Sequence, residues 1–131
     1  MLHKEELIKL TLEKSDLAIK AAKDNINLDN LETAQNRIYY AIFYAVSALA
    51  YENDFITSKH KQLMGWFNKK FIHENKIFGE NMFDIYKNSF SNRLKGDYEI
   101  LFLTNKEDMV KSIEEAAFFV EEIKKYFIKV L

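Results

Sequence analysis

The segment NRIYYAIFYA, residues 36–45, decides the fold of this 131-residue chain. It lies within a longer run, residues 29–52, in which apolar or small side chains recur every three or four positions without proline or glycine. That spacing predicts a helix with one continuous buried stripe. The stripe is rich in alanine, which lets a neighbouring helix approach closely; it consists of Ala34, Ile38, Ala41, Ala45 and Ala48.

The same periodicity predicts four further helices, over residues 3–24, 58–75, 80–95 and from Thr104 onward. In the first of them, one face is expected to pack on the core through Leu7, Leu10, Leu17 and Ala21, with Ile8, Leu12 and Ile19 widening that face. Capping boxes are predicted at two helix starts, because acidic residues follow the cap at the required spacing: Asp29 with Glu32, and Thr104 with Glu107. Gly96 is expected in a left-handed conformation after a helix end.

The composition favours an all-α protein. Proline is absent and glycine occurs three times, too few turn formers for an all-β domain. Hydrophobic residues make up 48% and charged residues 30%, as in a folded globular chain. The prediction is an antiparallel up-and-down bundle of four to five helices that forms a single domain over residues 1–131.

Several classes of site are not expected from this sequence. The chain has no cysteine, so disulfides, thiolate metal sites and thiol nucleophiles are excluded, and the cytoplasm is the expected location. No signal peptide and no membrane-spanning run is recognised. The three histidines, His3, His60 and His73, show no metal-ligand spacing, and no phosphate-binding glycine loop occurs. We therefore expect neither a metal nor a cofactor.

Charge is unevenly distributed along the chain. Residues 58–78 contain five lysines and one acid, whereas residues 107–122 contain six acids and one lysine. Both segments are interpretable as solvated helix faces. The basic segment also begins beside His60, which would then be surrounded by positive charge and is a candidate acid, base or phosphate donor.

Arginine occurs at two positions only, Arg37 and Arg93, against 17 lysines. A guanidinium group matches the geometry of phosphate and carboxylate, so both are candidates for ligand binding. The structural alternative for Arg93 is an ion pair with Asp97 four residues on. Arg37 lies on an apolar helix and shares a face with Tyr40 and Tyr44. The structural alternative to ligand binding by Arg37 is therefore a polar network with these tyrosines inside the bundle.

Three segments together resemble the HEPN family (higher eukaryotes and prokaryotes nucleotide-binding domain). Residues 36–45 resemble its second-helix pattern of an arginine followed by paired tyrosines. Residues 58–61 and 67–71 are similar to its third helix, and residues 93–98, RLKGDY, to an arginine followed by Asp-Tyr. The resemblance covers about Leu31 to Tyr98 and implies a helical bundle, usually dimeric.

The resemblance also implies a range of activities. Many members are metal-independent ribonucleases, often toxins, with histidine four to six residues after an arginine. Others pair with a small nucleotidyltransferase or bind nucleotides without cleaving them. In this chain Tyr44 occupies the position of the histidine counted from Arg37, and a tyrosine is a poor base at neutral pH.

These observations lead to one preferred function and two alternatives. We expect a nucleotide- or RNA-binding module that acts with a partner protein such as a nucleotidyltransferase in a toxin–antitoxin-like pair. It is also expected to form a homodimer through the second helix and its neighbours, with Tyr39, Phe43 and Tyr51 as surface aromatic residues of the dimer contact. The alternatives are a ribonuclease that uses Arg37 and His60, and a bundle that only binds other proteins. The expected ligand-binding residues are Arg37, Tyr40, Tyr44, His60, Arg93, Asp97 and Tyr98.

Overall fold

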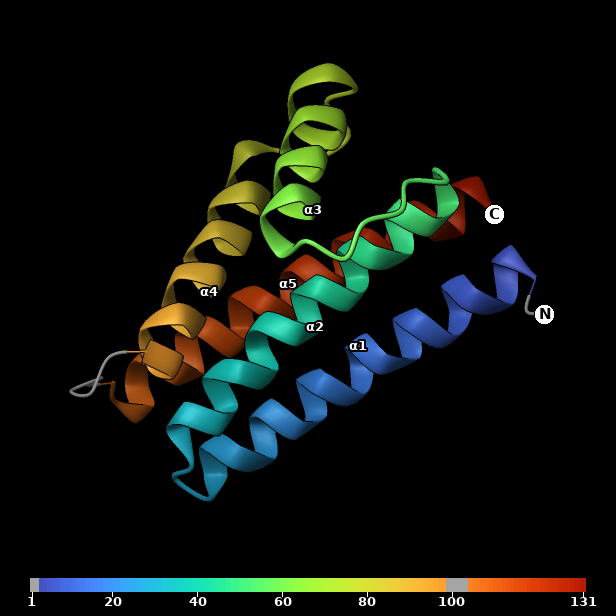
Figure 1. The fold of residues 1–131 in the computed structure, drawn as a ribbon. Helices are drawn as coiled ribbons and strands as arrows, with labels where there is room; N and C mark the ends of the chain where they lie inside the picture. Colours follow the sequence, from blue (N-terminus) through green and yellow to red (C-terminus); the bar gives the residue numbers. More distant parts are fainter. Residues whose placement is uncertain (1–2, 99–103) are drawn as a thin grey trace.

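The computed structural model describes residues 3–98 and 104–131, without the side chain of Tyr98. These residues contain helices and no strand. In chain order the helices are α1 (Lys4–Asn27), α2 (Leu31–Glu52), α3 (His60–Phe67), α4 (Glu80–Tyr98) and α5 (Lys106–Val130), and α3 continues directly into a π-helical segment, η1 (Asn68–Glu74) (Figure 1). The predicted all-α class and the five helices are confirmed.

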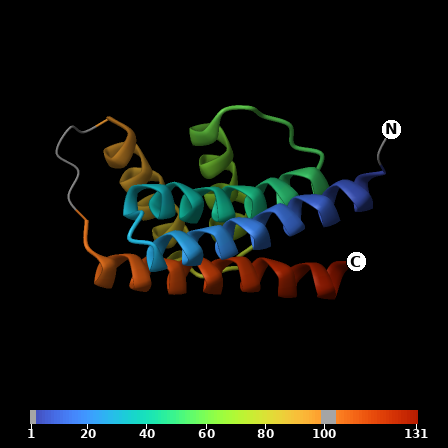
Figure 2. The same cartoon turned by 90° about the horizontal axis from the view of Figure 1, so that it is seen from below.

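The helix α2 lies at the centre of the bundle. It contacts α1, α3, α4 and α5. Figures 1 and 2 show α1 and α5 running along α2, while α3 with η1 and α4 form a hairpin that leans away from these three helices. The start of α1 and the end of α5 lie at the same end of the bundle. The predicted helix at residues 29–52 is thus the element on which the others pack.

The alanine stripe of α2 is buried within the chain and meets α1 at Ala41. All five stripe residues are at most 2% exposed. The Ser15 hydroxyl of α1 donates a hydrogen bond to the Ala41 carbonyl of α2 over 2.6 Å, which is feasible only if the two backbones approach closely. The stripe is therefore used within the chain and is not free to form a dimer interface.

The predicted core face of α1 is wrong at two leucines. Ile8 is buried, and Leu12 and Ile19 pack against the core, as expected. Leu10 and Leu17, however, are 45% and 65% exposed, and the buried residues of α1 are Ile8, Thr11, Ser15, Ala18, Ala22 and Ile26. The physical reason is the close approach to α2, which favours small and hydroxyl side chains at the contact over leucine. The prediction gave weight to the largest apolar residues, and these lie one position away on the helix surface.

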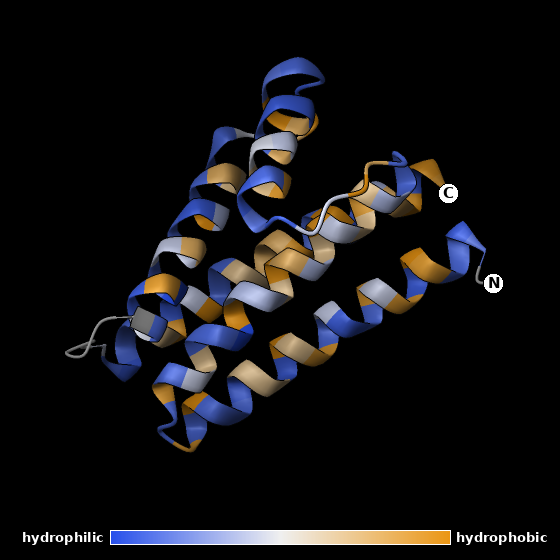
Figure 3. Ribbon diagram, viewed as in Figure 1, coloured by the Kyte–Doolittle hydropathy of each residue, from blue (hydrophilic) through white to orange (hydrophobic). Residues whose placement is uncertain are grey.

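The remaining core is rich in aromatic side chains. Phe67, Phe71, Tyr86 and Phe119 are at most 1% exposed, and their rings lie within contact of one another, with the Phe67 and Tyr86 centroids 5.7 Å apart. In the π-helical turn, Phe71 and Ile72 are both buried although they are consecutive. Figure 3 shows apolar residues concentrated along α2 and hydrophilic residues on the outside of the α3–η1 end.

The predicted helix ends need three corrections. Asp29 has a φ of 61° and lies in the turn before α2, so Asn30 is the N-cap and no side chain caps that helix. Before α5 the cap is Asn105, not Thr104: its side-chain oxygen accepts a hydrogen bond from the Asp108 amide at 2.8 Å. Gly96 lies inside α4, because the helix continues to Tyr98 and does not end at Lys95.

The α1–α2 contact predicts that two neighbouring substitutions change the free energy of unfolding by very different amounts. Ala18→Leu is expected to lower the free energy of unfolding by about 1–3 kcal/mol, because the added carbons have no room against α2. Leu17→Ala is expected to change it by less than about 0.5 kcal/mol, because that side chain is exposed. Urea denaturation followed by circular dichroism measures both values. A larger loss for Leu17→Ala would mean that α1 packs through the leucine face after all.

Candidate functional site

A cluster of aromatic rings and one arginine joins three helices beside α2. Helix α2 contributes Tyr39, Tyr40 and Phe43, α3 contributes its first residue, His60, and α4 contributes Arg93. We call these five residues the aromatic–arginine cluster. Tyr39 is fully buried, whereas the other four are half-buried, so the cluster opens to solvent on one side.

His60 is held between two rings of α2. Its imidazole is stacked on Phe43, with centroids 4.4 Å apart and planes within 10°. Its Nδ1 lies 2.6 Å from the Tyr39 hydroxyl. Because Tyr39 is fully buried and this hydroxyl has no other hydrogen-bond partner in the described part of the chain, the hydroxyl proton is best satisfied by donation to Nδ1. The imidazole then carries its own proton on Nε2.

The surroundings of His60 favour its neutral form. Burial lowers the pKa of His60 below the ordinary value of 6.5, and the positive charge of Arg93 lowers it further. Burial also raises the pKa of Tyr39 well above its usual range, so the hydroxyl remains protonated. At neutral pH the pair is therefore uncharged, with an imidazole N–H as the remaining donor.

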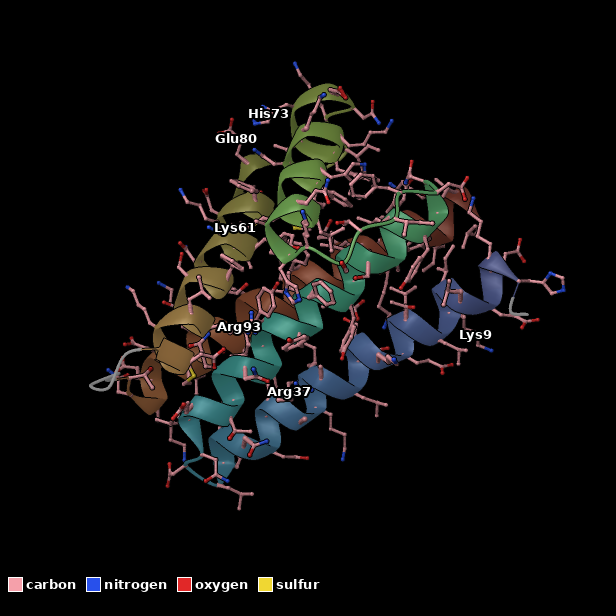
Figure 4. All side chains as sticks on the ribbon, viewed as in Figure 1. Lys9, Arg37, Lys61, His73, Glu80 and Arg93 are labelled. Atoms are coloured by element: carbon pink, nitrogen blue, oxygen red, sulfur yellow. The ribbon has the colours of Figure 1, made fainter. Side chains whose placement is uncertain are left out.

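Arg93 lies over the faces of two tyrosine rings. Its guanidinium carbon is 5.0 Å from the Tyr39 centroid and 5.4 Å from the Tyr40 centroid, which is cation–π distance. The predicted ion pair with Asp97 is present, with Nε and Oδ2 3.4 Å apart. Figure 4 shows Arg93 projecting from α4 toward α2. Its charge is thus held in place and partly neutralised from within the chain.

Arg37 also lies within cation–π distance of Tyr40. Its guanidinium carbon is 5.1 Å from the Tyr40 centroid, and it donates to the Asn36 side-chain oxygen at 2.8 Å. Within the described residues it forms no salt bridge. The predicted hydrogen bonds to tyrosine hydroxyls are not formed, because the guanidinium lies over the Tyr40 ring.

A shallow groove between α1 and α2 begins at Arg37. It has a volume of about 310 Å³ and is lined by Lys14, Arg37 and Tyr44 together with apolar residues of α1. The Lys14 ammonium lies 5.8 Å from the Tyr44 centroid. We call this the Arg37 groove. Its lining contains two cations and no acid, so it is suited to an anionic group.

The structure brings most of the predicted site residues together. Tyr40 contacts both arginines and also His60, at 6.0 Å between ring centroids, and its ring lies 5.8 Å from that of Tyr44. His73 is separate, at the far end of η1, as Figure 4 shows. The backbone of Tyr98 ends α4, but its predicted binding role concerns a side chain outside the described part.

Sequence reasoning missed the roles of Tyr39 and Phe43. Both were expected on the surface as part of a dimer contact, but Tyr39 is 0% exposed and both rings hold His60. The available signal was their spacing of four residues, which puts both rings on one ridge of α2. The sequence offers no sign that this ridge meets the start of α3.

Two absences apply to the described residues, 3–98 and 104–131. Within them, no group of three or more His, Cys, Asp or Glu side chains is arranged to hold a metal ion. In the same part of the chain, none of the helices combines the length and apolar character needed to cross a bilayer.

Comparison with known proteins identifies a family and several relatives of this chain. A family model described as "HEPN domain" matches residues 8–126. The chain is 32% identical over 125 residues to "UPF0332 protein" of Thermotoga maritima, covering 95% of this chain and 94% of that protein. It is 30% identical over 126 residues to "Putative toxin MJ0142" of Methanocaldococcus jannaschii, covering 96% and 84% respectively. A second protein of that organism, "Putative toxin MJ0605", is 30% identical over 129 residues, covering 96% and 92%.

The Tyr39–His60 contact predicts a specific titration. The pKa of His60 is expected below 6.5, with Nε2 as the protonated nitrogen, and in Tyr39→Phe the pKa should rise because the neutral ring loses its donor. Nitrogen-15 NMR titration measures the tautomer and the pKa, and His60→Gln assigns the signal. An Nδ1-protonated ring in the wild type would contradict the assignment.

The same shift predicts how stability depends on pH. Because the folded-state pKa of His60 lies below the unfolded value near 6.5, the unfolded chain takes up the proton first as pH falls. This contribution is therefore lost on acidification, from about pH 6.5 down to the folded pKa. Urea denaturation between pH 7.5 and pH 5 should show a smaller loss in His60→Gln than in the wild type. Equal losses would show that His60 titrates alike in both states.

Proposed function

The chain belongs to the HEPN family, and we propose that it binds the phosphate groups of a nucleotide or of RNA at the aromatic–arginine cluster and the Arg37 groove. One observation carries the proposal: a half-buried tyrosine ring, Tyr40, lies within cation–π distance of two arginines, at 5.1 Å from Arg37 and 5.4 Å from Arg93. Aromatic faces flanked by guanidinium groups suit a ligand that has both bases and phosphates.

The two arginines differ in how free they are to bind an anion. Arg93 is only 20% exposed at its side chain and is paired with Asp97, so it is mainly a fixed positive charge. Arg37 has no carboxylate partner in the described chain and lies beside the cationic lining of the Arg37 groove. Arg37 is therefore the proposed direct phosphate ligand, with Lys14 as a second cation.

His60 fits a binding role in this proposal. Donation from Tyr39 to Nδ1 leaves Nε2–H as the free donor of the ring. A neutral imidazole N–H donates to a phosphate oxygen but accepts no proton from a ribose hydroxyl. General-base chemistry at Nε2 would require the other tautomer, which would deprive the buried Tyr39 hydroxyl of its acceptor.

The family relatives extend the proposal to partners. Two relatives are named as toxins, so we propose that this chain acts in a toxin–antitoxin-like pair in the cytoplasm, with a small nucleotidyltransferase as the expected partner. A homodimer is also proposed. Its contact must involve surfaces other than the alanine stripe, because that stripe is buried within the chain.

A ribonuclease remains the second candidate, since one observation favours it. His60 and Arg93 meet around the same two tyrosine rings, which places an imidazole and a guanidinium in one half-open cluster although Tyr44 replaces the motif histidine. In such an enzyme the imidazole would move the 2′-hydroxyl proton and the arginine would stabilise the phosphate charge.

Ligand binding is expected to depend on Arg37 more than on any lysine. Arg37→Gln should fold normally, because within residues 3–98 and 104–131 the Arg37 side chain hydrogen-bonds only to the adjacent Asn36 side chain. Affinity for a fluorescent single-stranded RNA should fall by about 1.5–3 kcal/mol, the range for hydrogen bonds to a charged group. Fluorescence anisotropy measures the affinity.

Two control variants show whether the loss of RNA affinity depends on the position of Arg37 or only on the net charge of the protein. Lys9→Gln removes one charge from the outer face of α1, away from both arginines (Figure 4), and should leave affinity nearly unchanged. Lys69→Ala is expected mainly to reduce the salt dependence of binding. Unchanged affinity in a folded Arg37→Gln protein would reject the site.

The purified protein is expected to show little or no ribonuclease activity. The reason is the replacement of the motif histidine by Tyr44 together with the Nε2-protonated state of His60. Incubation of unstructured RNA with the protein in chelator, followed by gel analysis, measures cleavage. Robust cleavage that is lost in His60→Ala would favour the ribonuclease over the binding module.

A further inference from the structure

A second groove lies between α4 and α5. It has a volume of about 580 Å³ and is lined by one face of each helix, including Asp84 and Asn88 of α4 and Glu114, Glu115 and Phe118 of α5. We call it the α4–α5 groove. Phe118 is 45% exposed, so the groove offers an apolar surface beside its charges.

The charges of this groove are mainly negative and unpaired. Its lining contains three carboxylates, Asp84, Glu114 and Glu115, and one cation, Lys111. None of these four forms a salt bridge within residues 3–98 and 104–131. A net negative groove with an apolar rim favours a cationic side chain that is accompanied by an apolar one.

A small polar well adjoins the groove and contains an unsatisfied amide. The well has room for one water-sized group, about 30 Å³, and shares the wall residues Ile85, Asn88 and Glu115 with the groove. Gln35 lines it and is 2% exposed, yet its Nε2 has no hydrogen-bond partner in the described chain. A buried amide without a partner is costly, so the well is incomplete as the chain stands alone.

We propose that the α4–α5 groove is the docking site for a protein partner that presents an arginine or lysine beside an apolar side chain. The cation lies among Asp84, Glu114 and Glu115, and the apolar side chain packs on Phe118. The tip of the cation reaches the well, where the Gln35 amide turns its oxygen toward it; the two ends of an amide exchange by rotation about one bond.

Charge distinguishes this partner from the ligand of the aromatic–arginine cluster. A nucleic acid in the α4–α5 groove would bring phosphates against three carboxylates, which is unfavourable. Gln35 and Arg37 are two positions apart on α2 and therefore point to opposite sides of that helix. The groove and the phosphate-binding site are thus separate surfaces, and this inference does not depend on the proposed function.

The test uses the full chain labelled with nitrogen-15 and a short amidated helical peptide with one arginine four residues from a leucine. A second peptide has citrulline in place of the arginine, which keeps the shape and removes the charge. The arginine peptide is expected to shift the amide signals of Asn88, Ser112 and Glu115 but not those of Arg37 and His60. Titration should show at least about fivefold weaker binding of the citrulline peptide.

Matched variants test the two parts of the groove. Glu115→Gln should weaken binding of the arginine peptide at least about fivefold. Glu107→Gln makes the same change on the same helix but outside the groove lining, and it should leave this affinity unchanged. Gln35→Met removes the unsatisfied amide at similar volume, so it should fold at least as stably and still lose affinity.

Three outcomes would overturn the proposal. The first is equal binding of the two peptides, or no binding of either. The second is equal affinity of Glu115→Gln and Glu107→Gln. The third is self-association of the free protein that Glu115→Gln abolishes in sedimentation, which would make a second copy the occupant. If Arg37→Gln loses RNA binding but keeps peptide binding, the result supports the proposed phosphate site and leaves the groove proposal unaffected.

Discussion

The close contact between α1 and α2 constrains the rest of the bundle. Ser15 donates to the Ala41 carbonyl over 2.6 Å, and the alanines at positions 34, 41, 45 and 48 of α2 are fully buried. Tyr39 and Phe43 lie on another face of α2, against residues of α3 and α4, whereas Tyr44 lines the Arg37 groove beside α1. This arrangement places Tyr39 and Phe43 where the start of α3 brings His60 between them. The position of the site follows from the packing of helices that contribute little to its chemistry.

The site is assembled at some cost in stability. The Tyr86 hydroxyl and the Arg93 Nε are buried without a hydrogen bond in the described chain, although Nε lies within ion-pair reach of Asp97. Unsatisfied buried groups cost about 1–3 kcal/mol each, and the cation–π contacts of Arg93 return about 0.5–2 kcal/mol. A bundle selected for stability alone would replace such groups with apolar ones. Their presence beside a half-open cluster is typical of a site in which function, and not packing, determines the side chains.

Helical periodicity predicted the existence and order of all five helices, because each buries one face over several turns. It could not predict which face of α1 is inside, since that depends on how near α2 approaches: Ala18 is 3% exposed and Leu17 is 65% exposed. The residues of the site were partly predictable, because Arg37, Tyr40 and Arg93 carry unusual chemistry in an apolar or lysine-rich context. The partnership of Tyr39 with His60 was not predictable, because it joins residues 21 positions apart through the crossing of two helices.

The two proposed surfaces share one helix, and this links them. Helix α4 carries Arg93 into the aromatic–arginine cluster, and it carries Asn88 and Asn92 into the walls of the α4–α5 groove and its well. Figure 1 shows α4 leaning away from α5 along most of its length, and α4 is also held by contacts with α2, α3 and η1. Any coupling between the two surfaces would run through α4, because α4 holds Arg93 over its two tyrosine rings. Linkage is reciprocal: if the partner changes the affinity for an anionic ligand, the ligand changes the affinity for the partner by the same factor. Because α4 contributes both to the cationic aromatic cluster and to the acidic groove, such a coupling would need no further helix.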